Sequence, residues 1–262
     1  MNFKDFMRFH EDGMAEWGYF GKIISYIGGD KSEHLNYGSG TGHAADPMLY
    51  VPIKRGETEM ANIISSARRK IAKRGIECKP NPISWGGWDC KQAETPHNAD
   101  IMHTGESHVT VAQDKELEAF FKDAKTIDEK VNLLKQVKTE NGISLFDENG
   151  IGIKMPIVAS TPAEIIYGVS KFFKNRPLVA LLKIECPLMQ EVRSALGLGP
   201  LPPNYKSHIT IGYAYGVVLD DLITTDLTKG TVSDSASKKH NKGFLSRMGI
   251  DQYATEKLGP NL

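Results

Sequence analysis

Hydrophobic and polar positions divide the middle of the chain into short runs whose spacing predicts strands and helices. Residues 48–54, MLYVPIK, form a run rich in strand-favouring side chains. In the segment that follows, apolar residues recur three and four positions apart, and this pattern closes near Gly75. The helical positions are Met60, Ile63, Ile64, Ala67 and Ile71. The sequence therefore predicts a strand and then an amphipathic helix, and residues 106–112, ESHVTVA, alternate like a further strand.

The second half of the chain shows the same order of elements. The run PLVALLKIEC, 177–186, is typical of a buried strand. Pro187 is expected to open a short helix that ends around Gly197. Residues 207–216, SHITIGYAYG, alternate as another strand. The order strand, helix, strand is therefore predicted twice.

Two capping boxes lie between these halves. TIDE, 126–129, and TPAE, 161–164, both have the Thr-x-x-Glu order that satisfies the first backbone N–H groups of a helix. We therefore expect a helix to begin at each place and the region between the two halves to be mostly helical.

The two ends of the chain differ from the middle in composition. Residues 1–47 end in a stretch rich in Gly, Ser, Asn and Asp, which mark turns, so the sequence predicts an N-terminal extension. From residue 228 onward the chain has little to bury, and residues 228–262 are expected to form a polar C-terminal tail. The predicted folded domain is 48–227.

Composition and charge limit the function classes. Lys and Arg together number 32, as do Asp and Glu, so no global field draws the protein to long double-stranded nucleic acid or to a membrane. Any binding of phosphate must be local. Three cysteines are too few for a disulfide framework, and no long apolar stretch indicates export or membrane insertion. These features predict a cytoplasmic protein.

One five-residue frame occurs twice in the chain. The order Ser-His-β-branched-Thr-β-branched is found at 107–111 and again at 207–211, and no other of the eight histidines has Ser or Thr two residues later. In a strand, His108 and Thr110 point to one face while their aliphatic neighbours point to the other, and His208 and Thr210 repeat this arrangement. Two such faces supply an acid, a base and two hydroxyl donors, which is what metal-free phosphodiester transfer needs. Because neither strand alone can present acid and base to one phosphate, the 108–111 and 208–211 strands are predicted near the middle of two sheets, with the four side chains lining one cleft.

The doubled His-x-Thr resembles the signature of the 2H phosphoesterase superfamily, whose members include RNA 2′,3′-cyclic phosphodiesterases and nucleases that destroy 2′–5′ oligoadenylate. The resemblance covers roughly residues 48–217. It implies an α/β (α+β) fold of two pseudo-symmetric lobes, each a small β-sheet with helices, around a central cleft. Within the superfamily, MLYVPIK and SHITIGYA are most similar to phage anti-CBASS nucleases.

The resemblance implies that His108, Thr110, His208 and Thr210 are catalytic, and that Tyr50 contacts the nucleotide. An aromatic residue at a strand start also serves as core packing. Three further residues are assigned to substrate binding: Trp85 and Trp88, whose indoles can stack on a base, and Lys206, directly ahead of the second repeat. Packing is the alternative role for at least one of the tryptophans.

The function expected from this resemblance is metal-independent cleavage of 3′–5′ linkages in cyclic di- or trinucleotide messengers, by attack of the ribose 2′-hydroxyl, without a cofactor. Such an enzyme blocks bacterial antiphage CBASS signalling from the host cytoplasm. The alternative activities are RNA 2′,3′-cyclic phosphodiesterase and 2′–5′ oligonucleotide processing. A non-enzymatic alternative is a zinc-stabilised interaction protein, with Cys90, His97, His103 and His108 as ligands.

Overall fold

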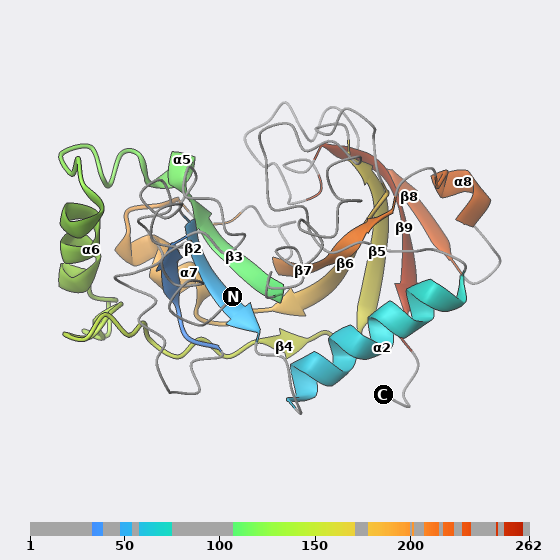
Figure 1. Cartoon of the computed structure of the whole chain (residues 1–262), viewed down its shortest axis with the longest axis horizontal. Coiled ribbons are helices and arrows are strands. Elements are labelled where there is room, and N and C mark those ends of the chain that lie inside the picture. Colours follow the sequence, from blue (N-terminus) through green and yellow to red (C-terminus); the bar gives the residue numbers. More distant parts are fainter. Residues whose placement is uncertain are drawn as a thin grey trace, which may run out of the picture.

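The fold of this chain combines helices with antiparallel sheets and belongs to the α+β class (Figure 1). The computed structural model describes residues 33–38, 48–53, 58–74, 107–170, 178–199, 201, 207–214, 217–222, 227–231, 245 and 249–258. Among the helices of these residues, none is long and apolar enough to cross a membrane.

The described residues form the following strands and helices. The strands are β1 (Asn36–Gly38), β2 (Met48–Ile53), β3 (Ser107–Gln113), β4 (Val158–Ala159), β5 (Glu164–Ser170), β6 (Leu178–Glu185), β7 (Ser207–Ala214), β8 (Thr228–Thr231) and β9 (Ile250–Lys257). The helices are α2 (Glu59–Lys73), α5 (Asp114–Leu117), α6 (Ile127–Gln136), α7 (Met189–Ala195) and α8 (Leu219–Leu222). The two predicted strand-helix-strand units are confirmed as β2-α2-β3 and β6-α7-β7.

The strands form a three-stranded sheet, in the order β1-β2-β3, and a six-stranded sheet built around β6, β5, β9 and β8. In the larger sheet, Ile184 of β6 pairs with Ser207 of β7 and also with Ala159 of β4. A strand has only two sides, so β7 lies on the side of β6 opposite to β4 and β5 and forms the edge there. Strand β3 is the edge of the smaller sheet, and β3 and β7 lie against each other (Figure 1). The edge strands of the two sheets thus meet.

The helices of the two units are exchanged between the sheets. Helix α2 follows β2 in the chain but packs against the six-stranded sheet, where Arg74 and Lys70 reach Glu256 of β9. Helix α7 follows β6 but lies by the smaller sheet, where Arg193 donates to the Val111 carbonyl of β3. Figure 1 shows α2 along β5 and β9, and α7 beside β2. Each unit therefore contributes a helix to the packing of the other.

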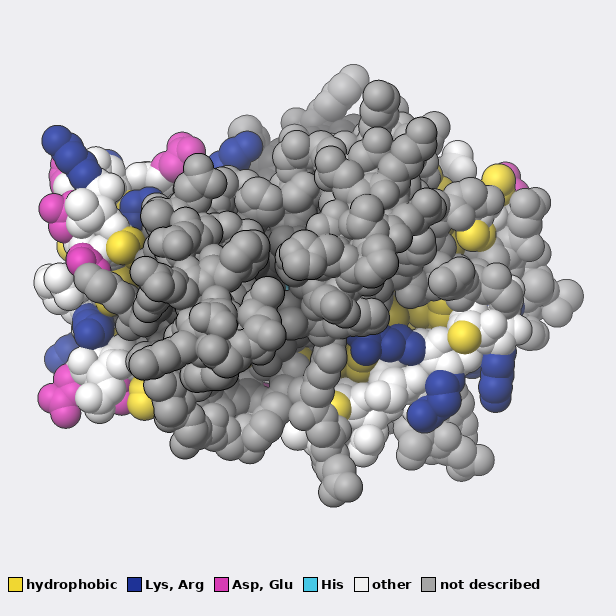
Figure 2. Space-filling model, in the orientation of Figure 1, with side chains coloured by type: hydrophobic (Ala, Val, Ile, Leu, Met, Phe, Trp, Pro, Cys, Tyr) yellow, Lys and Arg dark blue, Asp and Glu magenta, His cyan; other side chains and the backbone are white. Residues whose placement is uncertain are grey.

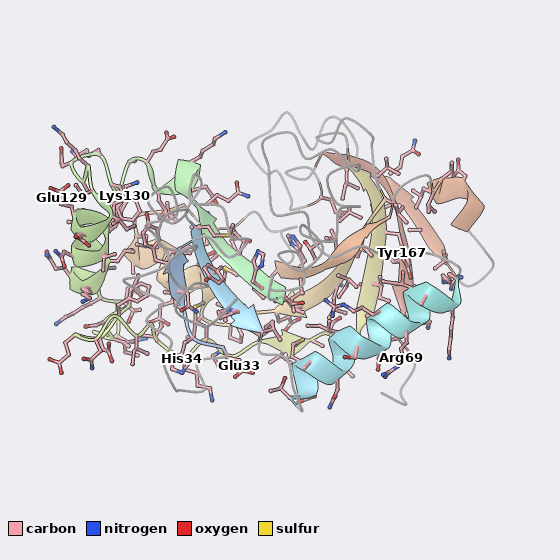
Figure 3. All side chains as sticks on the ribbon, viewed as in Figure 1. Glu33, His34, Arg69, Glu129, Lys130 and Tyr167 are labelled. Carbon is pink, nitrogen blue, oxygen red and sulfur yellow. The ribbon has the colours of Figure 1, made fainter. Side chains whose placement is uncertain are left out.

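Glu256 is the centre of the contact between α2 and the larger sheet. Its carboxylate is 3% exposed, is paired with Arg74, and accepts a hydrogen bond of 2.6 Å from the Tyr167 hydroxyl. Burial by itself raises the pKa of this carboxyl, but Arg74, Tyr167 and Lys70 outweigh it and hold the pKa below its ordinary value. Figure 3 shows Tyr167 on β5 in the sheet that α2 crosses. The ionised carboxylate therefore links helix and sheet.

Because the folded-state pKa of Glu256 is lowered, its stabilising contribution is present above the pKa of the unfolded chain and is lost as pH falls through the folded-state value. We expect Glu256→Gln to lower the free energy of unfolding by about 2 kcal/mol at pH 7, the scale for hydrogen bonds to charged groups. The difference from wild type should shrink at about pH 3. Urea titrations at both pH values measure it, with exposed Glu140→Gln as control. An equal difference at both pH values would contradict the ionic role.

The capping box at Thr126 is confirmed and the one at Thr161 is wrong. Helix α6 begins directly after Thr126, and the Glu129 side chain accepts from the Thr126 backbone N–H at 2.9 Å. Hydrogen bonds from the backbone of Thr126 and Lys125 lower the pKa of Glu129. In the second case Glu164 begins strand β5, because pairing with β6 and β9 satisfies its backbone and buries the side chains that follow. The region between the repeats is therefore less helical than expected.

The expected extension and tail both contribute strands. Strand β1 lies within residues 1–47 yet pairs with β2, and Leu35 and Tyr37 are fully buried. Strands β8 and β9 lie within residues 228–262 and pair with each other, while β9 also pairs with β5. Strand β9 has few apolar residues, but Ala254 packs in the core. The prediction of an unpacked polar tail is wrong for Ile250–Lys257.

The surface seen in Figure 2 carries both signs of charge among the described residues. Lys and Arg side chains gather along the side where α2 lies, and acidic and basic side chains are interspersed at the end that carries α6. Figure 3 labels Glu129 and Lys130 on α6 at that end, and Arg69 on α2. This mixture agrees with the balance of 32 basic and 32 acidic residues in the sequence.

Candidate active site

The two His-Thr repeats occupy equivalent positions in their sheets. In the smaller sheet, Ser107 pairs with an isoleucine of β2, and the next pairs are His108 with Pro52 and Thr110 with Tyr50. In the larger sheet, Ser207 also pairs with an isoleucine, Ile184 of β6. The next pairs there are His208 with Lys183, Ile209 with Leu182, and Thr210 with Leu181. The repeat in the sequence is therefore a repeat in strand pairing.

Both repeats also contain a β-bulge at the same place. Pairing skips from Thr110 to Ala112 in the smaller sheet and from Thr210 to Gly212 in the larger one. The residues passed over are Val111 and Ile211, each directly after the motif threonine. A bulge bends its strand and changes the direction of nearby side chains. Thr110 and Thr210 therefore both lie directly before a β-bulge.

The histidine and threonine of each repeat face away from one shared core. The aliphatic residues that alternate with them belong to a single core cluster and are at most 2% exposed. They are Val109, Val111, Ile209 and Ile211. The four motif side chains are only partly buried. Because β3 and β7 lie against each other, two neighbouring edge strands carry the His-Thr pairs on the faces turned away from this core.

The structure corrects one expectation about these strands. The sequence predicts that each motif strand lies near the middle of its sheet, so that the two together present acid and base to one phosphate. Instead β3 and β7 are edge strands within the described part of the fold. The physical reason is that the two sheets meet along these edges, so each strand is buried by the other sheet rather than by a further hydrogen-bonded strand.

Tyr50 lies beside His108. The two residues are on neighbouring strands. Their ring centroids are 5.7 Å apart, and the ring planes form an angle of 77°, an edge-to-face arrangement. Because Tyr50 pairs directly with Thr110, it shares the face of the motif side chains. The Tyr50 side chain is 7% exposed, so it also packs. Tyr50 therefore lies beside the motif side chains, and its contact with a nucleotide stays a prediction.

Asn36 is a polar residue of this face that sequence reasoning missed. It pairs with Tyr50 across β1 and β2, so Asn36, Tyr50 and Thr110 form one row across the smaller sheet. It is 4% exposed and donates to the His34 carbonyl at 2.8 Å. Asn36 lies in the turn-rich segment assigned to the N-terminal extension, and only strand pairing reveals its place.

Arg193 of α7 supports the bulge of the first repeat. Its guanidinium is buried and donates from Nη1 to the Val111 carbonyl at 2.7 Å and from Nη2 to Glu116 at 3.0 Å. A bulged residue has lost its place in the ladder, so its carbonyl needs another donor. Arg193 supplies it one residue from Thr110 and comes from the opposite strand-helix-strand unit. The sequence shows only an arginine in a short helix.

Arg193→Met is expected to lower the free energy of unfolding by about 1–3 kcal/mol, the cost of leaving a buried polar group unsatisfied. Chemical denaturation measures this loss. Arg69→Met is the matched control, because Arg69 lies exposed on α2 and donates only to Ser66 of its own helix in the described structure (Figure 3). Equal stability of both variants would show that the bond to Val111 contributes nothing.

A lysine-glutamate pair flanks the second repeat. Lys183 pairs with His208 across β6 and β7 and therefore shares its face. Its ammonium lies 2.9 Å from Glu164 at the start of β5, and the two side chains are 26% and 22% exposed. Sequence reasoning treated this part of β6 as a buried apolar run. The lysine within LVALLKIE was the available indication that the run has a polar end.

Several predicted residues lie outside the described residues. Trp85, Trp88 and Lys206 are among them, as are three of the four suggested zinc ligands, Cys90 and two histidines. Within the described ranges, no group of three or more His, Cys, Asp or Glu is placed to hold a metal ion. The zinc hypothesis therefore stays a prediction. Burial raises the pKa of the described thiol, Cys186, to about 11, so it is protonated at neutral pH.

Comparisons with known proteins found no match among family models, curated proteins or solved structures. The resemblance to 2H phosphoesterases rests on motifs of this chain, chiefly the two repeats, and the activity that it implies is a proposal.

Proposed function

We propose that the protein is a metal-independent phosphodiesterase of the 2H type that cleaves 3′–5′ linkages in cyclic di- or trinucleotides. The observation that carries this proposal is the twofold pairing pattern, in which each His-x-Thr has the same register and the same bulge. A lone histidine on a strand needs no functional explanation. Two in equivalent geometry, on adjoining edge strands, are what acid and base catalysis on one phosphate requires.

The proposed chemistry divides the work between the two repeats. One of His108 and His208 removes the proton from the ribose 2′-hydroxyl, whose oxygen attacks the neighbouring phosphorus. The bond from phosphorus to the 5′-oxygen breaks, and the other histidine protonates that leaving oxygen. Thr110 and Thr210 donate hydrogen bonds to the nonbridging oxygens as negative charge develops on them. The products are a 2′,3′-cyclic phosphate and a free 5′-hydroxyl.

The tethered hydroxyl explains why a histidine pair suffices. The 2′-oxygen is already close to phosphorus, so attack within the nucleotide has a high effective concentration. The protein then needs to move protons and stabilise charge rather than to generate hydroxide. The biological role that we propose is removal of cyclic oligonucleotide signals in the bacterial cytoplasm, which blocks CBASS defence. The second candidate substrates are RNA 2′,3′-cyclic phosphates and 2′–5′ oligoadenylate.

The test is a substrate panel in excess chelator. Purified protein is incubated with cyclic dinucleotides, cyclic trinucleotides, 2′–5′ oligoadenylate and RNA 2′,3′-cyclic phosphates, and products are separated by chromatography. We expect cleavage of at least one cyclic oligonucleotide with chelator present. Cleavage of only the linear RNA substrates would favour the second candidates. No cleavage of any of them, or cleavage only after divalent metal is added, would overturn the proposal.

A further inference from the structure

Lys183 is an unusual residue for its strand. Strand β6 reads LVALLKIE, and Lys183 is its only basic residue. Alternate residues of β6, Leu178 to Ile184, lie in the main core, whereas Val179 and Leu181 belong to a separate cluster on the other face. Lys183 continues this second face, which also carries His208 and Thr210 because they pair with Lys183 and Leu181. Lys183 therefore lies on the face of the second repeat, opposite His208 of β7, while its ammonium contacts Glu164 of β5.

The partner of Lys183 is a carboxylate, which would compete with a bound anion. Glu164 accepts from its ammonium at 2.9 Å, and both side chains are about a quarter exposed. An ion pair this exposed contributes little to stability, so it does not explain a lysine in a buried strand. An ammonium also has three donors, of which Glu164 takes one. The pair therefore holds a positive charge, on the strand next to that of His208, in a form that a stronger anion can share or displace.

We propose that Lys183 binds a second phosphate of the substrate, next to the phosphate that reacts at His208 and Thr210. This inference rests on the proposed function and deepens it, because it makes the site selective for substrates with at least two phosphodiester groups. Directly opposite residues on antiparallel strands lie about 5 Å apart, and a lysine side chain adds several further ångströms of reach. A chain with no net charge has no general attraction for anions, so a local cation must supply it.

The two members of the pair are expected to have opposite effects on binding. Removing the Lys183 charge weakens binding of a ligand with two phosphates and leaves a ligand with one phosphate unchanged. Removing the Glu164 charge frees the ammonium and lowers repulsion, so it strengthens binding of the two-phosphate ligand. A merely structural ion pair predicts the same sign for both, because either change breaks the same contact.

The experiment measures binding rather than turnover, by titration calorimetry with ligands that lack the attacking hydroxyl. The two-phosphate probes are 2′-deoxy cyclic di-adenylate and 2′-deoxy cyclic adenylate-guanylate, and the one-phosphate probe is 2′-deoxy 3′,5′-cyclic adenylate. The proteins are wild type, Lys183→Met, Lys183→Arg, Glu164→Gln and a control, Lys122→Met, which removes one charge from a lysine that is 75% exposed.

We expect Lys183→Met to weaken binding of the two-phosphate probes by about 10- to 100-fold, the range for a hydrogen bond to a charged group. Glu164→Gln should tighten that binding, and Lys122→Met should leave it unchanged. Lys183→Arg keeps the charge and should retain most of the preference, which decides the matter if Lys183→Met fails to fold. Equal weakening of all probes by Lys183→Met, or weaker binding after Glu164→Gln, would overturn the inference. Failure of the wild type to bind any probe would instead overturn cyclic dinucleotides as substrates in the proposed function.

Discussion

Replacement of either motif histidine by alanine is expected to remove most of the turnover of cyclic oligonucleotides, by about 10²–10⁴-fold for each residue. The reason is that the proposed mechanism gives His108 and His208 separate tasks, one at the attacking oxygen and one at the leaving oxygen. Neither can perform both at once. Initial rates with each single variant and with the double variant measure the loss, and the double variant should be little slower than the slower single one because the two act as a unit.

The threonines and a third histidine serve as comparisons. Thr110→Ala or Thr210→Ala removes one of several donors to the phosphate, so each should cost less than loss of a histidine. His34→Asn is the matched control, because His34 contacts the Gly152 carbonyl at 2.7 Å and Asn keeps a donor there. This control should retain wild-type rates. A fully active His208→Ala protein would end the assignment of the repeats as catalytic.

A cyclic oligonucleotide without 2′-hydroxyl groups is expected to bind and to resist cleavage, whereas the ribose form is cut to a product with a 2′,3′-cyclic phosphate. The cause is that the attacking oxygen belongs to the substrate in the proposed reaction, so its removal leaves no nucleophile for the base histidine to activate. Chromatography of products after long incubation, with the ribose form in parallel, measures the difference. Mass spectrometry identifies the cyclic phosphate end.

Cleavage of the deoxy ligand would identify a different nucleophile. If the deoxy ligand is cleaved at a rate like that of the ribose ligand, water is the nucleophile, and the roles given to His108 and His208 are wrong even though the protein is a phosphodiesterase. A mixed deoxy-ribose cyclic dinucleotide provides the internal control, because only the linkage that follows the ribose should be cut.

Much of the secondary structure near the repeats could be predicted from the sequence because its periodicity is strong. The helical spacing of apolar residues that closes near Gly75 is α2, and the mainly apolar run of 177–186 contains β6. The doubled His-x-Thr was visible without any structure. Alternation along a strand then placed His and Thr on one face and the aliphatic residues on the other, as observed.

The errors have a common physical cause. TPAE has every local feature of a helix start, yet the residues after it form β5, since two neighbouring strands are available to pair with it. Strand β9 has too few apolar residues for its sequence to predict a strand. Its backbone hydrogen bonds to β5 and β8 decide its conformation. In both segments, pairing with other strands decides the conformation, and local residue types do not show this pairing.

The sequence by itself determined the candidate chemistry of this protein: which residues can transfer protons, which hydroxyls accompany them, and on which face of a strand they lie. Periodicity and residue type are local properties, so no partner is needed to read them. Only the tertiary structure decided that the repeats lie on edge strands that meet, that both contain a bulge, and that Arg193, Asn36 and Lys183 flank them. Register, bulges and exchanged helices depend on contacts between residues far apart in the chain, because strands and helices bury their apolar faces against whichever surface complements them.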